Sequence, residues 1–567
     1  MRKIQGIKVI LYIGLFVSFT AQGQSVLAPL NQDYYHKVER LEIKSGRLSN
    51  QVHSNIRPFE RSAIIDMVAQ FDSSKNQKIS KVDQWNIQYL KNDNWEYLAD
   101  GTVPSVSYKK PILKYIYRKK ADFLSAHTRD YDIHVSPILN LGGGTDMVSG
   151  ANSESQFINT RGVEIRGSLN NKLGFYTMFT ENQATTPDYI RTYARGQRGF
   201  PYLGFTKVVG DDSLTMKTDY IMAMGYIVFR PIKNLSLQFG HDKTFIGSGI
   251  RSMIISDFSA PYLNLKANAK IGRMQYLFMV AQMNDLQVER PATSKVTVPP
   301  KFMAFHHLNF NITKNFNLGL FENVFFGPRE SGFDMNYLNP IIFYRFVEGF
   351  LGSSDNALVG VDMKLNFFKT ASLYGQFVLD EFNLTENKKK GWWAKKYAAQ
   401  LGLRYIDVLT VKNLDLQIEG NLARPYTYSH LATVSNAINY NVPVAHPLGS
   451  NFAEFISILR YQPFGKLNLR VTYMNAVKGM DGADGFNWGG DIKKVNGENR
   501  PKDYDNFIGQ GYRNNIRLLD FNASFMLVHN LFIDASYMNR TSTLSKGSES
   551  LFKAAIRWNI ADNYQLF

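Results

Sequence analysis

The sequence predicts an all-β protein, an antiparallel barrel of about eighteen strands preceded by a small α-helical domain. Apolar and polar residues alternate persistently from about residue 131 onward, as strands with one apolar and one polar face require. Although 44% of the residues are hydrophobic and 14% are aromatic, the mean hydropathy is −0.25, so the apolar residues are dispersed rather than gathered into long runs. The connections between the expected strands alternate between short and long, which is typical of outer-membrane barrels.

The chain begins with a segment that resembles a secretory signal peptide, over residues 1–23. Arg2, Lys3 and Lys8 form its basic part, and an apolar run of eleven residues, 9–19, follows. Residues 21–23 (AQG) supply the small residues that a signal peptidase requires. Eleven apolar residues are too few for a membrane-spanning helix, which needs about 20. We therefore expect an exported chain that enters a membrane only as a barrel.

Residues 24–130 predict a small helical domain on the periplasmic side of the barrel. Apolar residues at helical spacing predict a first helix that ends near Gly46 and a second that begins near Pro58. Ser80 followed by Asp83 resembles the start of a third helix.

The barrel itself is predicted over residues 131–567, because charged residues recur on one face of its strands. In residues 414–422, apolar residues at even positions alternate with Asp415, Gln417 and Glu419. Lipid outside and water inside a barrel produce this pattern. The expected strands are 131–144, 157–170, 173–182, 219–231, 235–247, 262–270, 273–284, 301–314, 316–328, 356–369, 371–382, 395–408, 414–427, 452–465, 467–478, 514–528, 531–541 and 551–560.

The connections give an independent check on this assignment. Every even-numbered strand is followed by a short link, whereas odd-numbered strands are followed by longer ones, which reach 183–218, 285–300, 329–355, 428–451 and 479–513. Short periplasmic turns and long outer loops are the arrangement of bacterial outer-membrane barrels, and an even strand count returns both termini to the periplasm.

Charge and composition narrow the expected partners. The formal net charge is +17, but we find no basic helix, zinc spacing or aromatic platform that would indicate nucleic acid. An anionic lipopolysaccharide surface or an acidic polysaccharide fits this charge better. The chain has no Cys, and His306 and His307 are neighbours in a strand that point to opposite faces, so we expect neither a metal site nor a cofactor.

A polar insertion at residues 241–261 interrupts two alternating segments and is the first candidate site. Lys243 and Arg251 would pair with acidic sugars, because charge-assisted contacts favour such cations for carboxylates. Phe245 and Phe258 would stack on sugar rings. Alternatively, Arg251 and neighbouring acidic residues tie this loop across the lumen as a plug, because a folded loop needs internal polar partners.

Residues 241–261 (HDKTFIGSGIRSMIISDFSAP) resemble the corresponding loop of Wzi-type capsule assembly proteins. Residues 337–340 (YLNP) and 353–358 (SSDNAL) resemble a second landmark of that family, and residues 34–46 and 57–61 are similar to its form in gliding bacteria, the gliding motility protein RemB. The resemblance implies an eighteen-stranded outer-membrane barrel with a periplasmic helical bundle, acting as a surface lectin for capsular polysaccharide. One departure is Thr244-Phe245, where enterobacterial members carry two tryptophans.

We therefore expect a non-enzymatic outer-membrane protein of a Gram-negative envelope that anchors or helps assemble capsular or extracellular polysaccharide. Its expected partners are outer-membrane lipid and lipopolysaccharide, an acidic surface polysaccharide and, as the gliding form implies, motility or secretion machinery. A diffusion porin is the first alternative and an outer-membrane hydrolase the second. The expected ligand-binding residues are Lys243, Phe245, Arg251, Ser252, Ser256, Asp257, Phe258, Asn339 and Arg345.

Overall fold

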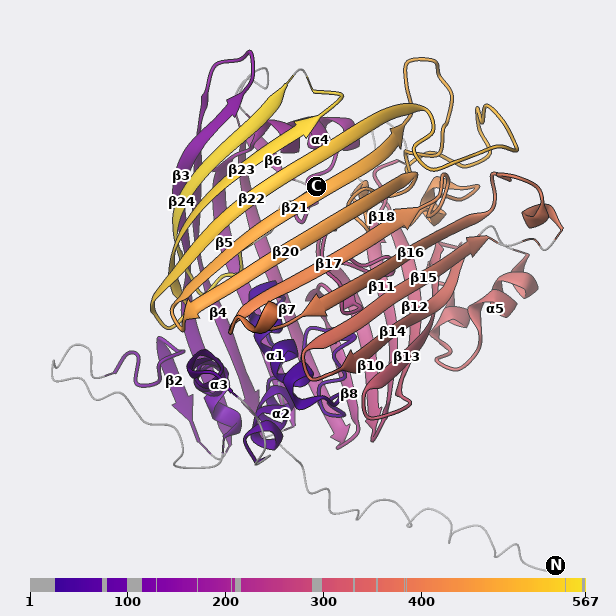
Figure 1. Ribbon diagram of the computed structural model, residues 1–567. Coiled ribbons are helices and arrows are strands. Elements are labelled where there is room, and N and C mark those ends of the chain that lie inside the picture. Colours follow the sequence, from indigo (N-terminus) through magenta and orange to yellow (C-terminus); the bar gives the residue numbers. More distant parts are fainter. Residues whose placement is uncertain are drawn as a thin grey trace, which may run out of the picture.

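The computed structural model describes residues 26–567 except 74–78, 99–114, 129, 171, 205, 210–215, 288–297, 330–331, 353–354, 382, 384, 546 and 563–565. The signal peptide predicted for residues 1–23 lies outside the described residues. Figure 1 shows a barrel of tilted strands with three helices at one end and long loops at the other.

The three predicted helices are present before the barrel, as α1 (Gln32–Ser45), α2 (Arg61–Ser73) and α3 (Lys81–Asp93). Helix α1 ends at Gly46, whose φ of 69° is readily adopted by glycine at a helix C-terminus. Helix α3 begins with a capping box, in which Ser80 and Asp83 each bond the backbone N–H of the other. No helix within the described ranges is long and apolar enough to cross a membrane.

Among the described residues, eighteen long strands pair antiparallel into a closed barrel, which confirms the predicted fold. They are β3 (Tyr131–Val148), β4 (Glu154–Leu169), β5 (Leu173–Thr185), β7 (Lys217–Ile232), β8 (Leu235–Asp242), β10 (Tyr262–Ile271), β11 (Met274–Asn284), β12 (Pro300–Asn311), β13 (Phe316–Phe326), β14 (Asn356–Phe367), β15 (Ala371–Glu381), β16 (Lys396–Tyr405), β17 (Leu414–Ala423), β20 (Phe452–Phe464), β21 (Leu467–Met480), β22 (Tyr512–Val528), β23 (Leu531–Ser542) and β24 (Ser548–Trp558). Strand β24 pairs back onto β3, from Glu549 opposite Val148 to Trp558 opposite Leu139, and so closes the barrel.

Shorter strands and two helices are added to the eighteen long strands. Strands β2 (Leu124–His127) and β6 (Lys207–Val209) extend the sheet beside β3 and β7. Two small separate sheets are formed by β1 (Ile56–Arg57) with β9 (Phe245–Ile246) and by β18 (Ile438–Asn439) with β19 (Val442–Pro443). The long connections also contain helices α4 (Asp188–Gln197) and α5 (Tyr344–Leu351).

The two ends of the barrel differ as the connection lengths predict. At the end that we call the turn end, links such as 272–273, 465–466 and 529–530 are short, and the helices contact them. The Tyr89 hydroxyl bonds Asn530 at 2.6 Å, and the Leu48 N–H donates to the carbonyl of Lys314 at 2.7 Å. The opposite end, the loop end, carries the long connections and α4 (Figure 1).

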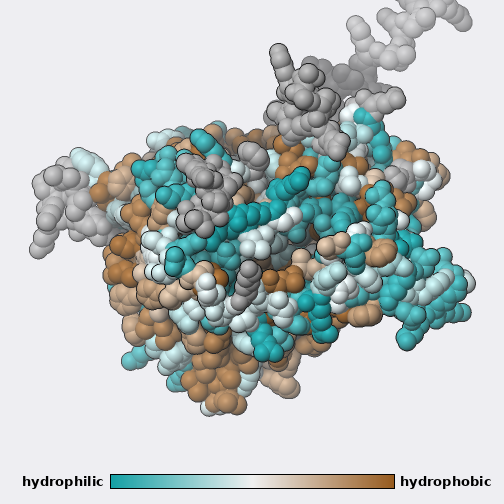
Figure 2. Space-filling view, turned by 90° about the horizontal axis from the view of Figure 1, so that it is seen from above, coloured by the Kyte–Doolittle hydropathy of each residue, from teal (hydrophilic) through white to brown (hydrophobic). Residues whose placement is uncertain are grey.

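The wall of the barrel is apolar outside and polar inside. In β10, Leu263 and Leu265 are exposed on the outer surface, whereas Asn264 and Lys266 are buried inside. The Lys266 ammonium bonds the Asp242 carboxylate at 2.9 Å, so the inward charge is paired. An outward apolar band of this kind faces lipid. In Figure 2, which is seen from above, brown residues gather at the left and bottom margins, and teal and white residues surround a central hollow.

The lumen contains protein from both ends. Helix α1 places Glu42 against the lumenal Lys364 at 2.5 Å, and Arg40 bonds Asp83, Asp407 and Asp415. One strand boundary differs from the prediction: the strand expected over 235–247 ends at Asp242, because the following residues leave the wall and pair with β1 inside the barrel.

Candidate functional site

The insertion predicted as the candidate site folds into the barrel, and we call residues 243–261 the lumen loop. Its β9 pairs with β1, with Ile246 opposite Ile56, so this loop meets the N-terminal region inside the barrel. The Gly247 N–H donates to the Asn55 carbonyl at 2.6 Å. Gly247 has a φ of 114°, and a Cβ there would lie 2.2 Å from Gln376 Nε2, so only glycine fits this close approach.

Arg251 lies at the centre of the lumen loop and is held on several sides. Its guanidinium contacts the Glu454 carboxylate at 3.1 Å and donates to the backbone carbonyl of Leu566 near the C-terminus. The Glu419 carboxylate accepts the backbone N–H groups of Ile250 and Arg251 at 2.7 and 3.0 Å. Glu419 of β17 and Glu454 of β20 are buried and point into the barrel. The neighbour of Glu454, Phe455, is exposed on the outer face, as alternation along a strand requires. The cation that was expected to bind sugar is therefore paired with the barrel wall.

Glu454 is shared between Arg251 and His446, a residue of the long connection 424–451. The His446 Nε2 lies 2.8 Å from the Glu454 carboxylate, and its ring stacks on Phe452 at 4.2 Å. Burial lowers the pKa of His446 below its ordinary value of 6.5, although the Glu454 carboxylate opposes this shift. The pair between Arg251 and Glu454 is thus completed by a buried, neutral imidazole.

The two serines of the lumen loop bond backbone groups. The Ser252 hydroxyl donates to the carbonyl of Ile246 at 2.6 Å and accepts the N–H of Ile254 at 3.1 Å. The Ser256 hydroxyl donates to the carbonyl of Ala445, and the Ser256 N–H donates to the carbonyl of Val444 at 2.8 Å. Both hydroxyls therefore stabilise the fold of the loop.

The aromatic and basic candidates of the lumen loop are also packed. Phe245 is buried with the Arg57 guanidinium 4.9 Å from its ring, and Phe258 is buried with its ring centroid 5.3 Å from that of Phe567. The Lys243 ammonium donates to the carbonyls of Tyr202 and Asp257 at 2.9 and 3.0 Å. Burial lowers the pKa of Lys243 to about 8, against the raising effect of the nearby Asp257 carboxylate.

These contacts are the ones expected if the loop ties itself across the lumen. Lys243 and Asp257 are the two predicted ligand residues of the lumen loop that are only half-buried. Sugar binding by these seven residues stays a prediction, and Arg251→Gln and Lys243→Gln variants would test it.

The two remaining predicted residues, Asn339 and Arg345, lie elsewhere, in residues 327–355, which we call the outer-wall loop. This loop packs against outward-facing residues of β12 and β13: the ring of Tyr344 lies 4.0 Å from that of His306, and the Tyr344 N–H donates to the Glu322 carboxylate at 2.6 Å. Figure 1 shows α5 outside the barrel wall. Asn339 and Arg345 are exposed there, so the structure does not bring them together with the lumen loop.

The long connections 383–395 and 481–511 form a group of exposed and half-buried aromatic and basic side chains at the loop end, which the sequence did not reveal. The Lys389 ammonium lies 5.2 Å from the ring of Tyr504, and the Arg500 guanidinium lies 3.9 Å from that of Trp393. The Lys502 ammonium lies 5.4 Å from the ring of Phe507. We call these six residues the aromatic-basic patch: Lys389, Trp393, Arg500, Lys502, Tyr504 and Phe507.

The patch offers exposed rings on which a sugar could stack. Phe507 is 57% exposed and Tyr504 is 39% exposed, so their rings are open to a ligand. Aromatic rings provide a large, rigid apolar surface. Two of the adjacent cations are paired within the patch, because the Lys389 ammonium lies 3.0 Å from the Glu386 carboxylate and the Arg500 guanidinium lies 2.7 Å from that of Asp503. The KKKGWW segment at 388–393 was the available signal in the sequence, but its partners lie more than a hundred residues away.

The lumen also contains a cavity of about 230 Å³, with a mixed polar and apolar lining, between the wall strands and residues 186–203. Gln156 lines it with both amide atoms buried and without a hydrogen-bond partner, and the side-chain oxygen of Asn140 is likewise unpartnered. Such groups suit bound water. Among the described residues, no group of three or more His, Cys, Asp or Glu side chains is placed to hold a metal ion.

Comparisons with known proteins agree with this architecture. A family model described as capsule assembly protein Wzi matches residues 138–518. The structure is similar to that of Wzi, an outer-membrane protein involved in group 1 capsule assembly in Escherichia coli and described as a carbohydrate-binding β-barrel. The two share 12% identity and a TM-score of 0.57, over 95% of this chain and 100% of that one.

Other similar structures are those of OccAB4 from Acinetobacter baumannii and OprD from Pseudomonas aeruginosa. The first has 9% identity and a TM-score of 0.41, over 76% of this chain and 98% of that one. The second has 11% identity and a TM-score of 0.39, over 75% and 92%. No curated protein matches the sequence.

Proposed function

The chain belongs to the Wzi capsule assembly family, and from this membership we propose that it anchors or helps assemble extracellular polysaccharide at the cell surface without catalysing a reaction. The match of the family model to residues 138–518 carries the proposal. The similar Escherichia coli protein is a carbohydrate-binding barrel, which supports the same class of ligand here.

The protein is an outer-membrane β-barrel of a Gram-negative envelope. We propose that its loop end faces the outside and its turn end the periplasm, because short turns are periplasmic in barrels of this class. In this orientation, the helices of the predicted domain 24–130 lie at the periplasmic end, with α1 and β1 reaching into the lumen, and residues 131–567 form the barrel. Outer-membrane lipid and lipopolysaccharide then surround the apolar wall.

The aromatic-basic patch is the proposed contact surface for the polymer. It lies at the loop end, where a surface polysaccharide arrives, and it combines exposed rings with cations. An acidic polymer makes many weak contacts along its length, so modest affinity for each sugar is sufficient to retain it.

The experiment compares acidic polysaccharide on washed cells with that in the medium, in a deletion strain complemented by variants. We expect the deletion to shift polymer into the medium with total synthesis unchanged, and the Tyr504→Ala/Phe507→Ala variant to behave like the deletion. Leu544→Ala, which removes an exposed apolar side chain from another connection at the loop end, is the matched control. An unchanged ratio in the deletion strain would exclude anchoring.

Occupation of the lumen argues against the porin alternative. The lumen loop, helix α1 and the C-terminal Phe567 all contribute side chains to the interior. We expect the purified protein to show no steady conductance in planar bilayers, and an open-channel conductance would favour the porin.

Two finer points have their own tests. The similarity of residues 34–46 and 57–61 to RemB adds a role with motility or secretion machinery to the proposal, and the spreading rate of the deletion strain tests it.

The absence of catalysis is tested by incubating the purified protein with the polymer, where new reducing ends would indicate a hydrolase.

A further inference from the structure

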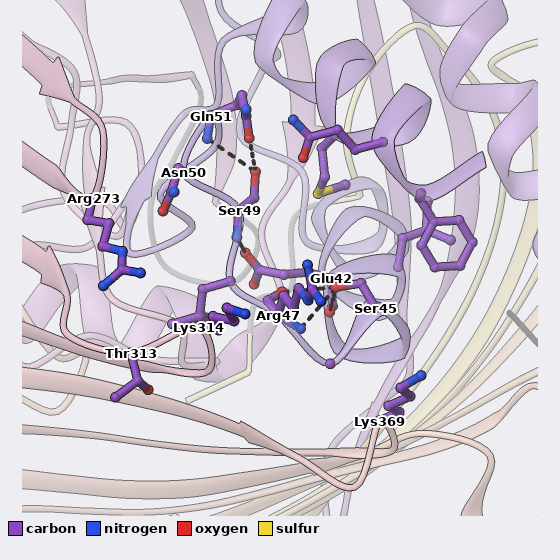
Figure 3. A pocket seen from close by; sticks show the side chains of 16 residues that line it. Glu42, Ser45, Arg47, Ser49, Asn50, Gln51, Arg273, Thr313, Lys314 and Lys369 are labelled. Carbon is purple, nitrogen blue, oxygen red and sulfur yellow. Dashed lines mark hydrogen bonds between the residues drawn. The ribbon is translucent and has the colours of Figure 1, made fainter. Parts of the chain in front are cut away.

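A second candidate binding site lies at the opposite end of the barrel, in a cavity of about 630 Å³ that we call the turn-end pocket. Its walls come from the end of α1, residues 46–51, one face of α2 and three turns of the barrel. The turns lie between β10 and β11, β12 and β13, and β14 and β15. Figure 3 shows side chains from the helices and from the turns around the same space.

Four cations line this pocket: Arg47 from the segment after α1, and Arg273, Lys314 and Lys369 from the three turns. All four are exposed. Among the residues that the structure describes, none of the four has an acidic partner within ion-pair distance. Figure 3 shows them distributed around the cavity rather than on one side.

The one acidic side chain of the pocket lining, Glu42, does not neutralise them. Its carboxylate is buried and bonds the Lys364 ammonium at 2.5 Å, the Ser54 hydroxyl at 3.0 Å and the Ser49 N–H at 2.9 Å. The pocket therefore presents a net positive charge to the solvent. Clustered like charges without counter-ions repel each other, and an anionic ligand relieves this repulsion.

The remaining side chains of the pocket lining indicate the chemical class of the anionic ligand. Ser45, Asn50, Gln51 and Thr313 provide hydroxyl and amide groups, which can donate to and accept from sugar hydroxyls. Leu41, Leu48, Met67 and Phe71 add apolar surface. The volume lies within the ~300–1,000 Å³ range of small-molecule sites. A bare inorganic anion would use the cations alone and leave the remaining lining unused.

We propose that the turn-end pocket binds an acidic oligosaccharide, whose uronate carboxylates or sugar phosphates pair with Arg47, Arg273, Lys314 and Lys369 while its hydroxyls bond the amide and hydroxyl side chains. The protein then has two saccharide sites, one at each end of a filled barrel. This inference rests on the proposed function only for the class of ligand, because the pocket and its charges are independent of the loop end.

The experiment measures binding of fluorescent tetragalacturonate to the full-length protein by anisotropy, in a detergent without sugar headgroups. We expect salt-sensitive binding that weakens at least ~10-fold when all four cations are changed to Gln, since each exposed pair contributes modestly. Gln70→Glu, a nearly isosteric change on the exposed lining of α2, should weaken binding by ~2–5-fold through repulsion. Lys412→Gln, in the turn between β16 and β17 outside the pocket, should have no effect.

Competitors identify the source of the anion. We expect glucose 1-phosphate to compete with tetragalacturonate, and neutral maltotetraose and inorganic pyrophosphate to compete poorly. Pyrophosphate that displaces tetragalacturonate completely at equal concentration would overturn the saccharide class. Absent binding, or a fourfold variant that binds like Lys412→Gln, would overturn the pocket itself. The proposed anchoring function has a separate readout, the polymer on washed cells after Tyr504→Ala/Phe507→Ala, so the two failures are distinguishable.

Discussion

Two long connections of the barrel, the lumen loop and the outer-wall loop, fold in opposite directions, and each meets a different face of the barrel wall. The lumen loop turns inward and places Arg251 against Glu454 and Glu419 of the wall. The outer-wall loop turns outward and lays α5 against the lipid-facing surface. The solvent inside a barrel is water and the solvent outside is lipid, so each loop is stabilised by the groups that its own side of the wall supplies.

The outward direction of the outer-wall loop is explained by two polar residues on the otherwise apolar outer face of the barrel. Glu322 of β13 and His306 of β12 lie on the outward face, where a carboxylate would otherwise meet lipid. The N–H groups of Tyr344 and Arg345, at the start of α5, bond the Glu322 carboxylate at 2.6 and 2.8 Å. The free N–H groups of a helix N-terminus suit an anion. The loop therefore covers a polar spot and presents its own apolar side chains instead, with Ile341 86% and Phe350 87% exposed.

The largest expected effect comes from breaking the ion pair of the lumen loop. Arg251→Met leaves the buried Glu454 carboxylate without its cation, and we expect a loss of about 3–5 kcal/mol in the free energy of unfolding. The loss is measured from the temperature at which the folded barrel band converts to the unfolded band in gel electrophoresis. A loss below 1 kcal/mol would mean that the apolar packing of the lumen loop, rather than this ion pair, stabilises it.

A charge on the exposed side of α5 tests the lipid contact of the outer-wall loop. Phe350→Asp should lower the unfolding free energy in lipid vesicles by about 2–3 kcal/mol, because it places a carboxylate in the apolar layer. Phe507→Asp, at the water-exposed loop end, should leave it unchanged within about 0.5 kcal/mol. Equal effects of the two changes would show that α5 faces water.

Acidification should destabilise the lumen loop more than the outer-wall loop. The folded-state pKa of His446 lies below its ordinary value of 6.5, so the unfolded chain binds the proton first as the pH falls. The stability of the lumen loop is therefore complete above about pH 6.5 and decreases below it, by at most about 1.4 kcal/mol per pH unit. Protease cleavage within residues 243–261 should rise between pH 7.5 and 5, and His446→Gln should flatten this dependence. An equal rise in cleavage of the outer-wall loop would contradict the assignment to His446.

The smallest effect is expected from the ion pair of α5. Arg345 contacts Glu348 at 2.8 Å, but its side chain is 58% exposed. Arg345→Met should change the unfolding free energy by less than about 1 kcal/mol, which makes it the matched control for Arg251→Met. A larger loss would show that the outer-wall loop also depends on charge pairing.

The wall and the helices could be predicted from the sequence because their signals are local. Alternation in residues 414–422 recurs in β17, and the short links recur at the turn end. Gly46 and the pair Ser80 and Asp83 marked helix boundaries that the structure reproduces. The resemblance to the capsule assembly family also followed from short segments, and the family model confirms it.

The roles of the candidate residues could not be predicted in the same way. The guanidinium group of Arg251 is suited to bind an acidic ligand. Whether it contacts sugar or protein depends on Glu454 and Leu566, which are distant in the chain. The direction of the outer-wall loop likewise depends on Glu322, whose outward position follows from strand register.

The sequence by itself determined the barrel, its strand number and the helices before it, since side-chain periodicity and caps act over a few residues. Only the tertiary structure decided which loops enter the lumen, which cover the wall, which side chains gather at the aromatic-basic patch, and which cations of the turn-end pocket lie without an acidic partner among the described residues. The physical reason is that a charged side chain is stabilised by whichever partner reaches it. Closure of the barrel brings Arg47 beside Arg273 and Lys314, and Lys389 beside Tyr504, across separations that local patterns do not encode.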